Sequence, residues 1–224
     1  MIYEKELSIG MFLIKEFGLL SKRLFDVVCS LVGLVVLFPL MLVIAILMKL
    51  SSPGPLFYTG TRIGRCGKPF RLLKFRTMVV NADKIGGPST ADDDPRVTTI
   101  GRALRRYKLD EIPQLINVLK AEMSFVGPRP EVAAEVELYS PEQRELLKVV
   151  PGITDWASMR FHNEGEILKG SSDPHQTYQQ KIRPEKIRLG LEYVRKRSFW
   201  VDLQILVGTL ELLVRTRAKS QPTE

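Results

Sequence analysis

The most apolar stretch of the chain, residues 27–48, has basic residues on both sides. It has about the 20 residues that cross the hydrocarbon core of a bilayer, so hydropathy alone predicts a transmembrane helix. Pro39 lies near its middle, where proline removes a backbone hydrogen bond and kinks a helix. A spanning helix would also place one basic flank outside, against the positive-inside tendency. The pattern therefore favours a helix that enters the membrane, bends at Pro39 and returns, which leaves both termini cytoplasmic. The basic residues are Lys15, Lys22 and Arg23 before the run, and Lys49, Arg62, Arg65, Lys68, Arg71, Lys74 and Arg76 after it.

The first 21 residues mix apolar and charged side chains without a clean period. An interfacial amphipathic helix and a frayed leader therefore both remain open for this segment. No small-residue cleavage site follows the apolar run, so the sequence does not fit a secretory signal peptide. The leader and the apolar helix form the first predicted unit, residues 1–50.

The chain beyond residue 50 has the pattern of a globular domain with a real core. Residues 56–58 and 70–78 read as short strands, separated by a basic loop over residues 60–69. Apolar residues then recur at helical spacing in two places, which predicts two amphipathic helices. The first stripe is Ile100, Ala103, Leu104 and Tyr107, and the second is Ile112, Leu115, Ile116 and Leu119.

Further helices are expected within residues 131–150 and 193–215. The last of these is apolar with a tryptophan near its start, which fits a membrane interface and ordinary core packing equally. Between them, residues 164–186 form a polar insertion. The pattern as a whole predicts a mostly helical α/β domain over residues 51–216 and a frayed tail over 217–224.

An acidic pair, Asp110 and Glu111, stands just before Pro113 and the second apolar stripe. Aspartate is a favoured N-cap and proline is tolerated in a first helical turn, so we expect the pair at a helix N-terminus. Unpaired backbone N–H groups and the helix dipole would keep a carboxylate ionised there and would attract phosphate. A simple capping role explains the same pattern, so the pair alone does not identify an active site.

The charge balance points to an anionic partner. The chain has 33 Lys and Arg against 25 Asp and Glu, a net charge of +8, which suits nucleic acid, acidic lipid or a phosphorylated substrate. No interleaved aromatic residues or nucleic-acid-binding motif accompany the basic residues, so no nucleic-acid partner is expected. Cations around the acidic pair fit chemistry on a phosphate ester instead. They are Arg102, Arg105, Arg106 and Lys108 upstream, and Arg129 in a Gly-Pro-Arg-Pro turn downstream.

The cysteine and histidine content excludes other kinds of site. Cys29 lies in the apolar run and Cys66 in a basic turn, so no disulfide is expected and a reducing compartment is indicated. The two histidines lie far from any cysteine pair, which leaves a zinc site without support. Residues 92–94 form a D-x-D pattern, so a metal-dependent glycosyltransferase that releases UDP remains an alternative. A membrane-tethered basic binding module is the other alternative.

Residues 94–130, DPRVTTIGRALRRYKLDEIPQLINVLKAEMSFVGPRP, resemble the signature of the bacterial sugar transferases, the monotopic phosphoglycosyl transferases. The similarity runs from about Lys22 to about Arg215. It implies an enzyme on the cytoplasmic face of the bacterial inner membrane, seated by a re-entrant helix, that initiates cell-surface glycan assembly. The family's Ser-Pro break in that helix is Phe38-Pro39 here. The reaction implied is transfer of a phospho-sugar from a UDP-sugar to undecaprenyl phosphate, with release of UMP.

The resemblance also implies roles for individual residues. Asp110 would attack the sugar-bearing phosphorus and form an aspartyl phospho-sugar, and Glu111, beside Asp110, would help hold Mg²⁺. Lys74 of KFRTM, Arg129 of GPRP and Asp202 of FWVDL would line the nucleotide-sugar site. Membrane lipid is a further expected partner, and a homodimer is left open.

Two departures from the family pattern lie close together. The family's P-G-I-T-G-W-A appears with Asp155 in place of the second glycine. The family's N-G-R-N becomes RFHN over residues 160–163, which puts His162 where the active-site arginine is expected. A protonated His162, or Arg160 two residues away, would then contact phosphate. Asp94, which opens the D-P-R-V-T element, has a structural role by the same resemblance.

Overall fold

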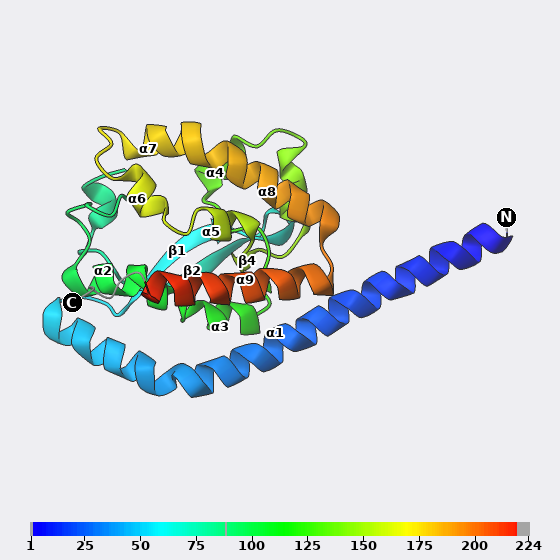
Figure 1. Ribbon diagram of the computed structural model, residues 1–224, viewed down its shortest axis with the longest axis horizontal. Helices are drawn as coiled ribbons and strands as arrows, with labels where there is room; N and C mark the ends of the chain where they lie inside the picture. The colour runs from blue at the N-terminus through cyan, green and yellow to red at the C-terminus, as the bar shows by residue number, and fades with distance from the viewer. Residues whose placement is uncertain (1, 88, 219–224) are drawn as a thin grey trace.

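The computed structural model describes the backbone of residues 2–87 and 89–218, and the side chains of residues 18, 20–87 and 89–215 (Figure 1). One very long helix, α1 (Ile2–Ser51), lies along one side of a compact domain. The leader and the apolar run, which the sequence divides in two, are therefore one continuous helix. Pro39 lies inside it, where its missing N–H breaks the backbone ladder. The helix changes direction in its second half, as such a break predicts (Figure 1).

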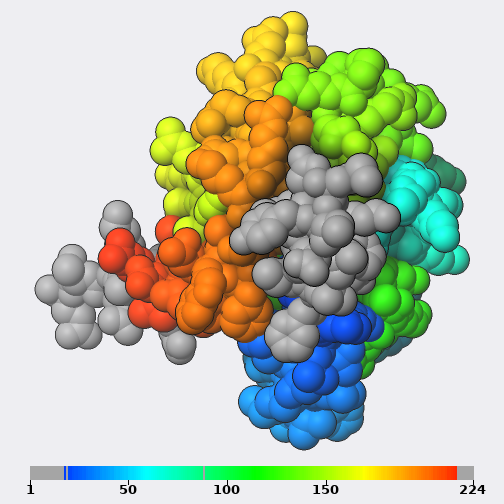
Figure 2. Space-filling view, turned by 90° about the vertical axis from the view of Figure 1, so that its right-hand side faces the viewer, coloured from blue at the N-terminus to red at the C-terminus, as the bar shows by residue number. Residues whose placement is uncertain are grey.

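Both ends of the apolar part of α1 are attached to the domain. Near one end, the Arg23 guanidinium donates to the carbonyls of Val118 and Leu119 at 2.6 and 2.8 Å. Near the other end, Ile44 and Met48 are buried in a core cluster with other apolar residues. Only 11% of the most apolar window between these ends is buried. Figure 2 shows α1, in blue, standing out at the lower edge of the molecule.

The domain begins with an antiparallel hairpin of β1 (Phe57–Ile63) and β2 (Pro69–Phe75). The predicted loop over residues 60–69 is too long, because pairing continues to Ile63 and Pro69 at the end of the ladder. The turn between them is tight: the Gly64 N–H donates to the Lys68 carbonyl at 2.8 Å. Cys66 and Gly67 accommodate it with φ of 59° and 74°.

A second, parallel pair of strands was not predicted from the sequence. It joins β3 (Ser124–Val126) and β4 (Gly152–Thr154), which are three residues each and too short to show a period. Their backbones come very close just beyond the pairing. A Cβ on Gly152 would lie 2.1 Å from the Gly127 nitrogen, so only glycine fits there.

The other α-helices of the described chain follow the β1–β2 hairpin. They are α2 (Thr99–Arg106), α3 (Gln114–Leu119), α4 (Ala133–Glu137), α5 (Trp156–Arg160), α6 (Glu164–Leu168), α7 (Pro174–Thr177), α8 (Arg183–Lys196) and α9 (Phe199–Ala218). The first amphipathic stripe forms α2, as predicted, with the Thr98 side chain as its N-cap. Residues 131–150 form α4 and a 3-10 turn, Gln143–Lys148, rather than one helix. The mostly helical α/β class is confirmed.

The polar insertion and the last helix both contribute to the core. Leu168 and Ile182 of the insertion are fully buried against Ala91 and Tyr178, so this segment is an integral layer of the domain. In α9, Ile205 is buried whereas other apolar side chains are exposed. The two alternatives for residues 193–215, core packing and an interfacial face, therefore apply to opposite sides of the same helix. Residues 219–224, most of the predicted frayed tail, lie outside the described residues.

Candidate active site

The acidic pair lies in a 3-10 turn, Leu109–Glu111, rather than at the start of a helix. The expectation that Asp110 caps the following helix is wrong, because α3 begins later, at Gln114, with Pro113 at its N-cap and no side-chain cap. The side chain of Asp110 is free of a capping role. The residue is 7% exposed, and its Oδ1 atom has no hydrogen-bond partner within the described residues. A buried carboxylate oxygen without a donor is costly and is ready to bind an incoming group.

Glu111, the next residue, has the opposite environment. Its Oε1 accepts from the Lys74 ammonium at 2.9 Å and from the Arg129 guanidinium, which also donates to Oε2 at 3.2 Å. Burial alone would raise the pKa of Glu111, but the charges of Arg129 and Lys74 outweigh it and hold that pKa well below its usual range. Glu111 is therefore an ionised anchor for two cations.

Burial raises the pKa of Asp110, and Lys74 opposes that shift through its charge. The two neighbouring carboxylates thus differ: one is held firmly ionised, and the other is buried in a site that disfavours its charge. Divergent pKa values in adjacent acids are typical of functional sites.

Lys74 and Arg129 come from separate elements that the fold brings together. Lys74 lies on β2, and Arg129 follows β3 in the Gly127–Pro130 turn, where it also donates to the Ile153 carbonyl at 3.2 Å. Burial lowers the pKa of Lys74, against the attraction of Glu111, whereas the charge of Glu111 raises the pKa of Arg129. The structure thus places Lys74 and Arg129 beside the acidic pair. Their expected role in lining the nucleotide-sugar site stays a prediction.

Asn117 fixes α3 against β2 beside this cluster, a role that the sequence does not reveal. The residue is fully buried in α3. Its Nδ2 donates to the Arg71 carbonyl at 2.8 Å, and its Oδ1 accepts from the Leu73 N–H at 2.9 Å. These bonds tie α3 to β2 next to Lys74, so the spacing between Lys74 and Glu111 depends on them.

Arg105 is a further cation of the site. It is the partly buried member of the basic run upstream, and its Nε donates to the Thr77 hydroxyl at 2.8 Å. Burial lowers its pKa, and the charge of Asp110 acts against that shift. Its neighbours Arg102 and Arg106 are exposed. The sequence carries a signal for this difference. Arg105 lies at the border between the apolar stripe of α2, which includes the buried Leu104, and the exposed face of that helix.

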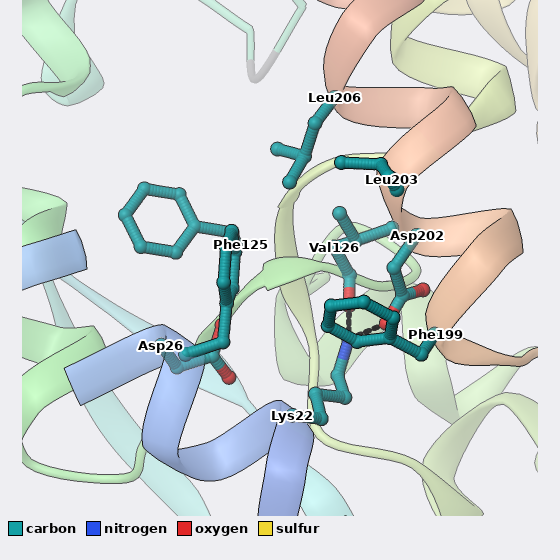
Figure 3. Close-up of a pocket in the computed structure, with 9 residues that line it drawn as sticks. Lys22, Asp26, Phe125, Val126, Phe199, Asp202, Leu203 and Leu206 are labelled. Carbon is teal, nitrogen blue, oxygen red and sulfur yellow. Dashed lines mark hydrogen bonds and ion pairs between the residues drawn. The ribbon is translucent and has the colours of Figure 1, made fainter. Parts of the chain in front are cut away.

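Asp202 does not join this cluster. Its carboxylate is ion-paired with Lys22 of α1 (Figure 3). It also accepts from the Tyr193 hydroxyl at 2.7 Å. Lys22 and Tyr193 both donate to the Val126 carbonyl as well, at 3.0 and 3.2 Å. No hydrogen bond or ion pair of the described residues links Asp202 to Glu111. The geometry makes Asp202 a brace between α1, α9 and β3, where it also lines a small pocket with Phe125 and Phe199 (Figure 3). Its expected place in the nucleotide-sugar site stays a prediction.

The two sequence departures have different outcomes. Asp155 is 2% exposed, and its Oδ1 accepts from the Ser158 N–H at 2.6 Å, so it caps α5. His162 has a buried Nδ1 atom without a partner among the described residues, and Arg160 is exposed. Within the residues that the structure describes, neither His162 nor Arg160 makes a hydrogen bond or ion pair with Asp110 or Glu111. Their phosphate-binding role stays a prediction.

The D-x-D pattern has little capacity to hold a metal. Asp94 accepts from the Arg96 guanidinium through both oxygens, at 2.7 to 3.1 Å, which satisfies its carboxylate. Asp93 accepts from the Gly170 N–H at 3.3 Å. The described residues contain no group of three or more His, Cys, Asp or Glu side chains placed to hold a metal ion. The structural role expected of Asp94 agrees with this ion pair.

The acidic pair fits Mg²⁺ only together with a substrate. Magnesium is often held by one or two carboxylates plus substrate phosphates. Among the described residues, one Asp110 oxygen has no hydrogen-bond partner, and one Glu111 oxygen has Arg129 as its only donor. Two carboxylates of this kind suit an ion whose other ligands come from a diphosphate.

The sequence model of the bacterial sugar transferases matches residues 17–216. The exopolysaccharide production protein ExoY of Sinorhizobium fredii is 42% identical over 220 residues, which cover 91% of this chain and 90% of that protein. A UDP-glucose:undecaprenyl-phosphate glucose-1-phosphate transferase of Caulobacter vibrioides is 38% identical, over 88% of this chain and 71% of that protein. The Escherichia coli K12 protein of the same name is 40% identical over 85% of this chain but only 39% of its own length. The chain thus spans well under half of that longer relative.

Proposed function

Because the chain belongs to the bacterial sugar transferase family, we propose that it transfers a phospho-sugar from a UDP-sugar to undecaprenyl phosphate. Two relatives are named as glucose-1-phosphate transferases of this kind. The observation that carries the proposal is the buried Asp110 oxygen, which has no donor among the residues that the structure describes and lies beside cations held in place by Glu111. A nucleophile with a free lone pair and a cationic surround is what displacement at a diphosphate requires.

The reaction is a double displacement at one phosphorus atom. In the first step an Asp110 carboxylate oxygen bonds to the sugar-bearing phosphorus. The bond from that phosphorus to the bridging oxygen breaks, and UMP leaves with the electron pair. In the second step an oxygen of undecaprenyl phosphate attacks the same phosphorus and expels the Asp110 carboxylate. The products are UMP and an undecaprenyl diphosphate sugar, and the enzyme is regenerated.

The neighbouring residues support these steps in distinct ways. Lys74 and Arg129, fixed by Glu111, present positive charge where the non-bridging oxygens gain negative charge. Arg105, through its charge, favours the ionised form of the Asp110 carboxylate before attack. Mg²⁺, held by Glu111 and Asp110 together with the diphosphate, would supply Lewis-acid assistance to the departure of UMP.

Two attachments of α1 to the domain support a re-entrant placement in the membrane. Asp26 accepts from the Phe125 N–H at 3.1 Å, and Met48 lies in the core cluster with Phe75 and Leu104. A straight helix from Asp26 to Met48 rises about 33 Å, which is about the thickness of a bilayer core. A helix that crossed the bilayer could not keep both ends on the same domain. We therefore propose a re-entrant α1, with the domain on the cytoplasmic face of the inner membrane.

The apolar face of α9 completes this seat. Trp200 and Val214 are 71% and 68% exposed on the same helix whose other side is buried. Exposed apolar residues of this kind suit the boundary between headgroups and acyl chains. The insoluble acceptor would then reach a polar active site from the plane of the membrane.

A panel of UDP-sugars with undecaprenyl phosphate tests the proposal when the nucleotide product is identified. Release of UMP that requires the lipid phosphate supports phosphoglycosyl transfer. Release of UDP would favour the metal-dependent glycosyltransferase, and no turnover of any sugar would favour the basic binding module. The Asp94–Arg96 ion pair argues against UDP release by a metal-dependent glycosyltransferase.

A further inference from the structure

A small pocket lies where α1, β3 and α9 meet (Figure 3). Phenylalanines from all three elements line it, together with Leu203 and Leu206 of α9. The Phe25 ring of α1 makes edge contacts with the other two, at 6.3 Å from the centre of Phe125 and 6.0 Å from that of Phe199. Figure 3 shows Phe125 on one side of the pocket and the α9 side chains on the other. The walls are therefore aromatic and aliphatic.

The charged side chains of the pocket are already bonded within the protein. The Lys22 ammonium is ion-paired with Asp202 and donates to the Val126 carbonyl at 3.0 Å. The Asp26 carboxylate accepts from the Phe125 N–H at 3.1 Å. An entering molecule therefore meets mainly phenyl rings and leucine side chains, which favour an apolar ligand.

The pocket lies between the apolar outer surface and the active site. Next to its lining residues in sequence are the exposed Leu24 of α1 and Trp200 of α9, at 66% and 71% exposure. On the inner side, Val126 ends β3 three residues before Arg129, so the Cα atoms of these two residues are at most about 11 Å apart. Arg129 in turn is ion-paired with Glu111 of the acidic pair. A chain molecule in the pocket therefore has one end near the membrane and the other near the site.

Undecaprenyl phosphate, the acceptor of the proposed reaction, has the matching chemistry, because it is a long hydrocarbon chain that ends in a phosphate. We propose that this pocket binds the isoprenoid chain of undecaprenyl phosphate close to its phosphate. The apolar lining holds the chain, and the phosphate then lies towards Arg129, within reach of the phospho-sugar on Asp110. This inference rests on the proposed function and adds the binding site of its lipid substrate.

Substitutions of Leu203 test the pocket without removing its ion pair. Leu203 is 37% exposed, so a larger or a polar side chain there should leave folding intact. Leu203→Trp fills the pocket, and Leu203→Gln keeps a similar size but places an amide in the apolar lining. Leu210→Trp and Leu210→Gln are the matched controls, because Leu210 lies two turns further along the same face of α9, is exposed and does not line the pocket. A change in how α9 meets the lipid or detergent should appear equally in the controls.

The test measures KM for undecaprenyl phosphate with the full chain in detergent, at saturating UDP-glucose or the UDP-sugar that the panel selects. Each Leu203 variant should raise this KM about 10-fold, because losing the burial of about two methylene groups changes an affinity by about that factor. The KM for the UDP-sugar should stay within about twofold. The burst of UMP formed without lipid, which reports only the first displacement, should not change. The Leu210 controls should match the unmodified chain in all three measurements.

Two results would overturn the inference while leaving the proposed function intact. One is a KM for undecaprenyl phosphate within about twofold of the unmodified chain in both Leu203 variants, which would assign the pocket to an ordinary membrane lipid or to no ligand. The other is an equal loss of the lipid-free UMP burst, which would assign the effect to a general disturbance of the fold. If the unmodified chain releases no UMP from any UDP-sugar, the proposed function fails, and the inference fails with it.

Discussion

Replacing Asp110 by asparagine separates the chemistry of this carboxylate from its effect on folding. The two side chains have nearly the same shape, but the amide cannot attack phosphorus. Turnover should therefore fall by roughly four orders of magnitude, as expected when a nucleophile is lost. A phospho-sugar adduct on Asp110 should form in the unmodified chain given UDP-sugar and Mg²⁺ without lipid, and it should be absent from the variant.

The same substitution should make the protein more stable. Asp110 is 7% exposed, its Oδ1 has no donor among the described residues, and burial raises its pKa, so the ionised form is disfavoured in the fold. A buried polar group without a partner costs about 1–3 kcal/mol. Asparagine removes the charge but keeps a polar group, so we expect a gain of roughly 1 kcal/mol at neutral pH, or about 2–4 °C in Tm.

The pH dependence of this gain has a definite sign. A raised pKa means that the fold tolerates the protonated acid and is destabilised as the pH rises through the raised value. Below the ordinary aspartate pKa of about 3.9, Asp110 is protonated in the folded and unfolded states, and the penalty disappears. The advantage of Asp110→Asn should therefore be present at pH 7 and should shrink as the pH falls towards 4.

Asp94→Asn is the matched control, because it makes the same change in an aspartate whose pKa is lowered in the fold, whereas the pKa of Asp110 is raised. Hydrogen bonds from Arg96 lower the pKa of Asp94, so its charge stabilises the fold above the ordinary pKa and that stability is lost in acid. Breaking this largely buried pair should cost about 3 kcal/mol at pH 7. Thermal unfolding in detergent at several pH values, with UMP release on the same samples, measures both effects. If Asp110→Asn keeps substantial turnover, or loses stability as Asp94→Asn does, the assignment of Asp110 as a strained nucleophile is wrong.

Three further predictions concern the supports of the site. Asp202→Ala should lower stability by about 3 kcal/mol, because it leaves the Lys22 ammonium without its carboxylate partner. The KM for the UDP-sugar should stay unchanged, and a raised KM at unchanged Tm would place Asp202 in the substrate site. Asn117→Ala should also cost about 3 kcal/mol through its lost buried hydrogen bonds and should reduce kcat in thermal-unfolding and UMP-release assays; full activity would show that the tie to β2 is dispensable. A cysteine introduced at Tyr3 or at Ser172 should resist a membrane-impermeant label added from the periplasmic side of cells, and labelling of the Tyr3 position alone would restore a spanning α1.

Local pattern was sufficient wherever the cause of a structure lies within a few residues. The apolar stripe predicted α2, and the apolar run predicted the apolar part of the long helix α1. The motif around Asp110 and Glu111 identified the family and brought Lys74 and Arg129 to the same site by resemblance. The 3-10 turn at the acidic pair was missed, because a left-handed Lys108 has no signature in a hydrophobic pattern.

Tertiary structure alone decided what depends on partners distant in sequence. The ion pair between Lys22 and Asp202 joins residues 180 positions apart, so no period or spacing could show that Asp202 braces α1. The same holds for the bonds from Asn117 to β2 and for the three-residue strands β3 and β4. Burial also decided the unequal pKa values of Asp110 and Glu111, because desolvation and the placement of Arg129 and Lys74 exist only once the chain has folded.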